Sequence, residues 1–323
     1  MARSGWFKKL QSVLGIAPSF SAVRSKRAGR AYRRIVVLSD IHYPSKTCIS
    51  GAPYMNKMAT KENALHDISH WRDVDLSVFT GDMVQRDGSQ AEYATVKAFV
   101  RGLRCRKAFI AGNHELLYSK DGAGHFTTAG LFDRILHMKR YTRTFGPLYY
   151  MRRLYGYVLI FLSPDVTTGQ AAVELSQQQL HWLQQVLTEN RDAPTIIFCH
   201  APLAGTALPD AAGVSRPGER DVAQPAQALA DILRHQPQVR LWVSGHTHTR
   251  PGDPDFMNPV NYFDGRILNV YNGDWDDNEA IYTNSLYLFA DRIVIRTYSH
   301  KDHCWLPQFD RVVTAVLRKR LAA

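Results

Sequence analysis

The sequence predicts an α/β protein built around two β-sheets. Short apolar runs rich in β-branched residues alternate with segments of helical periodicity, which is typical of βαβ units. Three further strand-like runs follow near the C-terminus, enough for a second sheet packed on the first. With 323 residues, of which 45% are apolar, the chain can bury one large core or two modest ones.

The first part of the chain supplies three strands and two helices. Buried strands are expected at residues 34–39, 76–80 and 107–111. Apolar residues at helical spacing predict helices over about residues 54–71 and 91–103. Each of the three strands ends at a short polar cluster.

The remaining elements follow the same reasoning. Helices are expected near residues 131–139 and over 174–187, where Ser176 is a candidate N-cap, and strands at 157–162, 195–199 and 239–243. A long segment at 203–224 contains several glycines and prolines, which predicts either a functional lid or disorder. The last three strands, at 267–271, 285–289 and 292–298, are expected to be antiparallel.

Residues 1–33 are predicted to form a basic extension ahead of a single domain at 34–323. Five apolar residues between Trp6 and Leu14 recur at helical spacing, and arginines crowd residues 24–34. An amphipathic helix with a basic tail can contact an anionic membrane through residues 1–34. A helix packed on the domain, or a mobile tail, is the alternative.

The composition limits the cellular compartment and the classes of partner that are expected for the protein. The formal charge of +11 favours polyanionic partners, namely phosphorylated substrates, nucleic acid or an acidic membrane surface. The four cysteines are scattered singly, which predicts free thiols in a reducing compartment. We expect a cytoplasmic protein without a membrane-spanning helix, with peripheral attachment at the inner membrane surface as the alternative.

Metal-binding side chains stand at the ends of five predicted strands. Because ligands of α/β sheets bind beyond the carboxyl ends of the strands, these side chains are expected to converge. The five clusters are Asp40-Ile41-His42, Gly81-Asp82, Gly112-Asn113-His114-Glu115, His200 and Gly245-His246-Thr247-His248.

The residue types suit a pair of metal ions acting on a phosphoester. Two dications about 3.5–4 Å apart can bind phosphoryl oxygens and generate hydroxide near neutral pH. Such a pair needs a shared anion, for which Asp82 after Gly81 is the candidate. The mixture of imidazole, carboxylate and amide donors favours Mn, Fe or Zn over Mg or Ca.

The five clusters resemble those of the calcineurin-like metallophosphoesterase superfamily, over about residues 34–300. The resemblance implies a four-layer α/β/β/α sandwich with two mixed β-sheets and a dinuclear metal centre. It implies that one metal would be held by Asp40, His42, Asp82 and His248, and the other by Asp82, Asn113, His200 and His246. It also implies that His114 contacts the phosphate and protonates the leaving oxygen.

Two departures argue against a Ser/Thr protein phosphatase. Gln85 stands where those phosphatases carry an aspartate that charges the catalytic histidine, and Tyr43 stands where they carry glycine. Asp87 is a substitute partner for the histidine. Arg86 aligns with a phosphate-gripping arginine, so the candidate catalytic residues are His114, Asn113 and Arg86, with an exposed loop arginine as the alternative for Arg86.

These features predict a metal-dependent phosphoesterase in which a metal-bridging hydroxide attacks phosphorus. A phosphodiester is the first expected substrate, a lipid-linked pyrophosphate the second and nucleic acid the third. The rival hypothesis is a binding module that keeps the fold without catalysis. Three acidic residues around Trp275, namely Asp274, Asp276 and Asp277, are interpreted as a solvated loop, with a position facing the site as the alternative.

Overall fold

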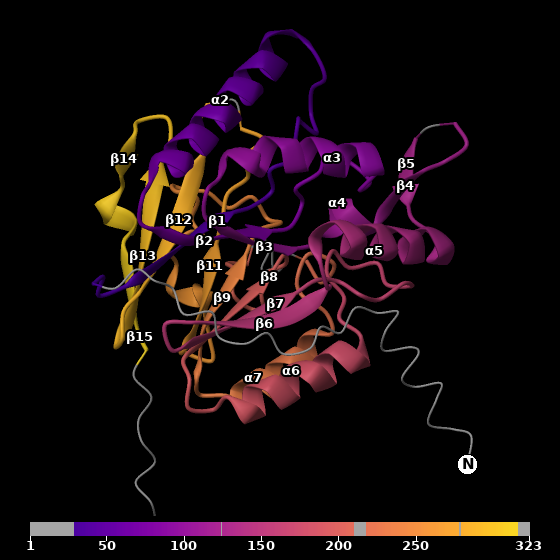
Figure 1. The fold of residues 1–323 in the computed structure, drawn as a ribbon. Coiled ribbons are helices and arrows are strands. Elements are labelled where there is room, and N and C mark those ends of the chain that lie inside the picture. The colour runs from indigo at the N-terminus through magenta and orange to yellow at the C-terminus, as the bar shows by residue number, and fades with distance from the viewer. Residues whose placement is uncertain (1–28, 124, 210–217, 278, 316–323) are drawn as a thin grey trace, which may run out of the picture.

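The computed structural model describes residues 29–123, 125–209, 218–277 and 279–315. Two large sheets face each other across a shared apolar core, and helices cover their outer faces (Figure 1). The predicted four-layer α/β/β/α sandwich is therefore confirmed.

The first sheet has seven strands in the order β14-β13-β12-β1-β2-β3, with β15 also paired to β13. Strands β1, β2 and β3 run parallel, and β12 joins β1 antiparallel. The strands are β1 (Arg33–Leu38), β2 (Val74–Thr80), β3 (Arg106–Ile110), β12 (Tyr282–Leu288), β13 (Arg292–Ser299), β14 (Cys304–Trp305) and β15 (Arg311–Thr314).

The second sheet has six strands in the order β10-β11-β9-β8-β7-β6. The central strands β7, β8, β9 and β11 are parallel, and both edge strands are antiparallel. The strands are β6 (Tyr149–Leu154), β7 (Tyr157–Leu162), β8 (Thr195–Cys199), β9 (Val239–Ser244), β10 (Tyr262–Phe263) and β11 (Ile267–Tyr271). A separate hairpin pairs β4 (Tyr118–Lys120) with β5 (Phe126–Thr128).

Helices cover both sheets. On the first sheet lie α2 (Gly51–His70), α3 (Gln90–Phe99), which continues as η1 (Val100–Gly102), and α5 (Leu131–Phe145). The second is covered by α6 (Gln177–Glu189) and α7 (Ala226–Arg234). Short turns complete the set: α4 (Asn113–Leu116), η2 (Pro259–Asn261) and η3 (Pro307–Phe309). Ser176 caps α6 by accepting from the Gln179 amide, as predicted.

The last three strands were predicted to be antiparallel and to form a second sheet with the earlier runs. This prediction is wrong about which strands lie together in one sheet. Strand β11 lies parallel to β9 inside the second sheet, whereas β12 and β13 form a hairpin that extends the first sheet from β1. The reason is burial: every residue of β11 is buried, as in a central parallel strand. Among the elements that were not predicted are β6 and α7; Arg152 and Arg153 interrupt the apolar run of β6.

The end of the predicted basic extension belongs to the fold. Arg34 is 3% exposed, and its Nη1 lies 2.8 Å from Asp73 Oδ1. Arg30 pairs with Asp75 at 2.7 Å. These arginines therefore have acidic partners within the fold, and the contact of residues 1–34 with an anionic membrane stays a prediction. Residues 1–28, with the predicted amphipathic helix, lie outside the described residues.

All four cysteines are free, in agreement with their scattered spacing. Among the described residues, no helix combines the length and apolar character needed to cross a membrane.

Candidate metal centre

The five polar clusters meet where the two sheets lie side by side at their carboxyl ends. Asp40, Asp82 and Asn113 follow β1, β2 and β3 of the first sheet. His200 follows β8, and the His246–His248 pair follows β9, both in the second sheet. The site is thus assembled from both halves of the sandwich. Three groups of donor atoms can be distinguished, and within each group the atoms lie within 4.8 Å of one another. The groups are Asp40, His42 and His248; His42, Asp82 and His114; and Asp82, His200 and His246.

Asp82 lies at the centre of these groups. Its Oδ2 is 3.3 Å from Nε2 of His200 and 3.9 Å from Nε2 of both His42 and His114. Burial opposes ionisation of the Asp82 carboxyl, but the imidazoles around it, His200 first, hold its pKa well below its usual value. An anionic oxygen shared by both halves of the site is what a bridging ligand requires.

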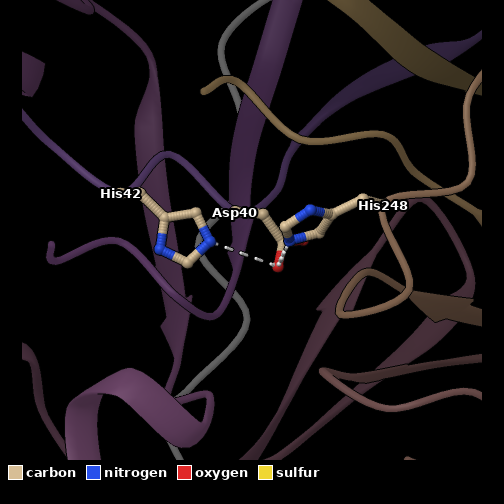
Figure 2. Close-up of side chains that lie close together, drawn as sticks. All are labelled: Asp40, His42 and His248. Atoms are coloured by element: carbon tan, nitrogen blue, oxygen red, sulfur yellow. Dashed lines mark ion pairs between the residues drawn. The ribbon is translucent and has the colours of Figure 1, made fainter. Parts of the chain in front are cut away.

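Asp40 joins the other side of the site. Its Oδ1 lies 3.3 Å from His248 Nε2 and 4.0 Å from His42 Nε2, and Figure 2 shows the two imidazoles on either side of this carboxylate. Asn113 contributes its Oδ1, which lies 3.0 Å from His200 Nε2. All seven predicted ligands therefore come together, and their division into two sets stays a prediction.

The imidazoles are oriented so that Nε2 faces the centre. In each of four histidines Nδ1 faces an oxygen outside the centre, which favours the tautomer with a lone pair on Nε2. The pairs are His42 with Val84 O (3.3 Å), His114 with Gln85 O (3.1 Å), His200 with Thr80 O (2.8 Å) and His248 with Asp274 Oδ2 (3.1 Å). This is the donor arrangement that transition metals need, so the residues fit the expected pair of ions.

The backbone at the ligand positions is strained. Five of the seven donors have positive φ although none is glycine: Asp40 (51°), His42 (45°), Asp82 (49°), His246 (65°) and His248 (53°). Non-glycine residues adopt this left-handed conformation rarely, and such strain gathers at functional sites. The turns after β1, β2 and β9 thus place their side chains at a cost in stability.

Glycines allow the turns to approach one another. A Cβ on Gly112 would lie 2.7 Å from the Asp82 amide nitrogen and 2.8 Å from His200 Cδ2. A Cβ on Gly245 would collide with the side chains of Ser39 and Asp40. A side chain at either position would therefore displace a predicted ligand.

Glu115 organises the turn beneath Asp82. Its carboxylate accepts four backbone N–H groups, from Gly112 (2.7 Å), Asp82 (2.9 Å), Met83 (2.8 Å) and Val84 (3.1 Å). Burial and the charge of Asp82 raise the pKa of Glu115 to about 7, although the N–H groups of Gly112 and Val84 act in the opposite direction. The sequence placed Glu115 in a cluster without a role, since nothing in the pattern marks a carboxylate that binds backbone.

Two neighbours of the histidines were not predicted as site residues. Lys46 Nζ lies 3.2 Å from His42 Nε2 and 3.3 Å from His248 Nε2, so a positive charge already faces both lone pairs. No sequence signal marks this lysine. Asp221, from the predicted lid segment, has Oδ1 3.5 Å from His246 Nε2. Residues 210–217 of that segment lie outside the described residues.

The interpretation of the acidic loop around Trp275 as solvated is wrong for two of its residues. Asp274 orients His248, as given above. Asp276 is 3% exposed, and its Oδ1 lies 2.7 Å from Nζ of the buried Lys61. The alternative interpretation, in which the loop faces the site, is the one that the structure supports, because these carboxylates have cationic or imidazole partners.

The catalytic candidates have distinct surroundings. His114 is oriented by the backbone carbonyl of Gln85, rather than by the predicted substitute Asp87, whose amide instead donates to Glu92. Burial lowers the pKa of His114. Arg86 has its guanidinium carbon 4.7 Å from the centre of the Phe126 ring, and its contact with a phosphate stays a prediction.

The sequence profile of the calcineurin-like phosphoesterase family matches residues 33–250, which include all seven donors. The chain therefore belongs to the calcineurin-like phosphoesterase family. It is 29% identical to a probable cyclic nucleotide phosphodiesterase of Synechococcus sp., over 55% of this chain and 59% of the relative. It is 26% identical to a probable glycerophosphodiester phosphodiesterase of Arcobacter nitrofigilis, over 66% of this chain and 71% of the relative.

The chain therefore spans less than two thirds of the first of these relatives. Among solved structures, a dimetal phosphatase from Danio rerio has the same fold, with a TM-score of 0.61 and 15% identity over 88% of this chain and 99% of that one.

Proposed function

We propose that the protein hydrolyses a phosphodiester at this centre, with two divalent or transition metal ions as cofactors. The observation that carries the proposal is the convergence of seven donors from five strand ends, with the imidazole Nε2 atoms turned inward. The names of the two bacterial relatives, both phosphodiesterases, support a diester rather than a monoester.

The metals would be held by the two predicted sets of ligands that share Asp82. When bound, the pair would supply Lewis acidity and a hydroxide nucleophile near neutral pH. A new P–O bond forms as the bond to the leaving oxygen breaks, so that oxygen needs a proton.

His114 is the proposed donor of that proton. It would act as the imidazolium, in which Nδ1–H donates to the Gln85 carbonyl and Nε2 carries the proton that passes to the leaving oxygen. Burial lowers the pKa of His114, and the charge of Asp82 opposes this by favouring the protonated ring. Asn113 and Arg86 are proposed to steady the phosphoryl oxygens. For Arg86 this requires the guanidinium to leave its contact with Phe126.

The test combines metal analysis with turnover of a p-nitrophenyl phosphodiester in the presence of Mn²⁺. We expect Asp82→Ala to lose both metals and all activity. We expect His114→Ala to keep the metals and to lose about 10²–10⁴-fold in kcat toward a diester with a poor leaving group. His181→Ala, a change of an exposed histidine on α6, is the matched control.

Three outcomes would contradict the proposal. Metal binding without turnover of any mono- or diester would favour the non-catalytic binding module. Full activity of His114→Ala toward a poor leaving group would remove its role as acid. Turnover restricted to lipid-linked pyrophosphates would identify the alternative substrate class.

A further inference from the structure

A basic groove runs between α3 and α5, away from the metal centre. Its volume is about 790 Å³. Five of its ten lining residues are basic, and among the described residues no acidic side chain lines it. The basic residues are Lys97 and Arg101 on one wall, and Lys139, Arg140 and Arg143 on the other.

The groove is held open by packed aromatic rings. Tyr93 of α3 lies at the base, with its ring centre 5.1 Å from that of Phe145 and 6.3 Å from that of Tyr141, both on α5. Lys97 and Arg101 are one helical turn apart, as are Lys139 and Arg143. Positive charges therefore line both walls on elements whose separation the core fixes.

The solvent face of α5 becomes apolar toward its N-terminus. Phe132 is 79% exposed, Leu136 55% and Leu131 47%. Phe132, Leu136, Lys139 and Arg143 are spaced by four, three and four residues, so they share one face of the helix. Asp133 is the one acidic residue of α5. The same helix thus presents large apolar side chains beside a basic groove.

The β4–β5 hairpin extends this surface toward the metal centre. Phe126 on β5 is 36% exposed and is flanked by Arg86 and by Lys120, whose Nζ lies 5.3 Å from the ring centre. At the other end of the hairpin, the Tyr118 ring lies 5.2 Å from the His114 ring. Figure 1 shows the hairpin and α5 on one side of the molecule.

We propose that α3, α5 and the β4–β5 hairpin form a surface that docks on an anionic lipid bilayer. Basic side chains near an anionic leaflet each gain attraction to the headgroups, and exposed Phe and Leu side chains gain by entering the acyl boundary. A nucleic acid would use the charges but would leave Phe132 and Leu136 in water.

The test is co-sedimentation of the full chain with vesicles of phosphatidylcholine alone or mixed with phosphatidylglycerol. We expect binding only to the anionic vesicles, and weaker binding at high salt. Since each basic side chain contributes about fivefold to partitioning, Lys139→Glu with Arg143→Glu should reduce it by about 25-fold or more. Phe132→Ser with Leu136→Ser should also reduce binding, including at high salt.

The matched control reverses the charge of two exposed arginines in the helical layer that covers the second sheet, Arg191→Glu with Arg234→Glu. It should leave partitioning close to that of the parent. Equal binding by the Lys139/Arg143 variant and the parent would overturn the proposal, because residues 1–28 or another surface would then carry it. The proposal would also be overturned if the parent bound no vesicles and the variant lost the parent's binding to a single-stranded oligonucleotide. The assay does not depend on catalysis, so its failure leaves the proposed hydrolysis standing.

Discussion

Glu115 holds the turn that carries Asp82. Its carboxylate binds the Asp82 amide and those of Met83 and Val84, and also reaches Gly112 on the next strand end. One buried side chain therefore joins the turns after β2 and β3, and so links the proposed bridging ligand to Asn113 and His114.

Replacement of Glu115 by Gln tests this link. The amide offers one acceptor oxygen where the carboxylate offers two, so about two of the four N–H groups lose their partner. An unsatisfied buried donor costs about 1–3 kcal/mol, and we expect the free energy of unfolding to fall by at least about 2 kcal/mol. Urea denaturation measures it, with Glu189→Gln on the surface of α6 as the control. Unchanged stability and metal content would show that the turn keeps its conformation without the Glu115 carboxylate.

Asp274 should tune metal binding through His248. Its carboxylate lies 3.1 Å from His248 Nδ1 and outside the donor set. Loss of such an outer partner typically weakens metal affinity by about 10–100-fold. We expect this for Asp274→Asn in calorimetric Mn²⁺ titration, with Asp264→Asn as the control. Equal affinities in all three proteins would refute a role for Asp274.

Lys46 should compete with the metal ion that is expected at His42 and His248. Its ammonium faces the Nε2 atoms of His42 and His248, where a cation would bind. Removal of a charge at this distance should raise metal affinity, by about tenfold or more, because like charges repel strongly in a partly buried site. Lys46→Met and the exposed control Lys301→Met are compared by metal titration. A lower affinity in Lys46→Met would mean that the lysine supports the centre instead.

The Lys61–Asp276 pair predicts an acid-sensitive contribution to stability. Burial raises the pKa of Asp276, but Lys61 and Lys57 outweigh it and hold the pKa below its usual value. A carboxyl whose folded pKa is depressed stabilises the fold above its unfolded pKa, near 4, and loses this contribution as the pH falls through the folded value.

Asp276→Asn should therefore lower the free energy of unfolding by about 3–5 kcal/mol at pH 7, because Lys61 is left charged and buried. The difference from the parent should shrink below about pH 4. Adding Lys61→Met should restore much of the loss. Denaturation across pH 3–7 measures all three proteins, and a loss that is independent of pH would contradict the pairing.

The sequence predicted those elements best whose residues are buried on both faces. Strands β7, β8 and β11 were predicted with the bounds that the structure has, because continuous apolar runs need no partner to be recognised. Edge strand β6 was missed because its arginines lie at the margin of the sheet. Pairing of β11 with β9 depends on a tertiary crossover that local pattern does not encode.

The site residues show the same difference between features that local sequence predicts and features that depend on the tertiary fold. The seven donors could be predicted because each stands at the end of a strand, and such ends converge in α/β sheets. Lys46 and Asp221 could not, because their roles depend on loops whose approach to the histidines is set by the fold. For Asp274, the sequence offered a position facing the site only as the alternative interpretation. Glu115 was visible in the sequence, yet its partners are backbone amides, which carry no sequence signature.

The left-handed turns at five of the donors set catalytic need against endurance. Glycine would relax the torsion at any of these positions, but it would also remove the donor atom. At Asp40 the exchange would in addition leave the His246 amide without its carboxylate acceptor. The conformational cost of these turns is therefore tied to the donor atoms, and it cannot be removed while the ligand set is kept.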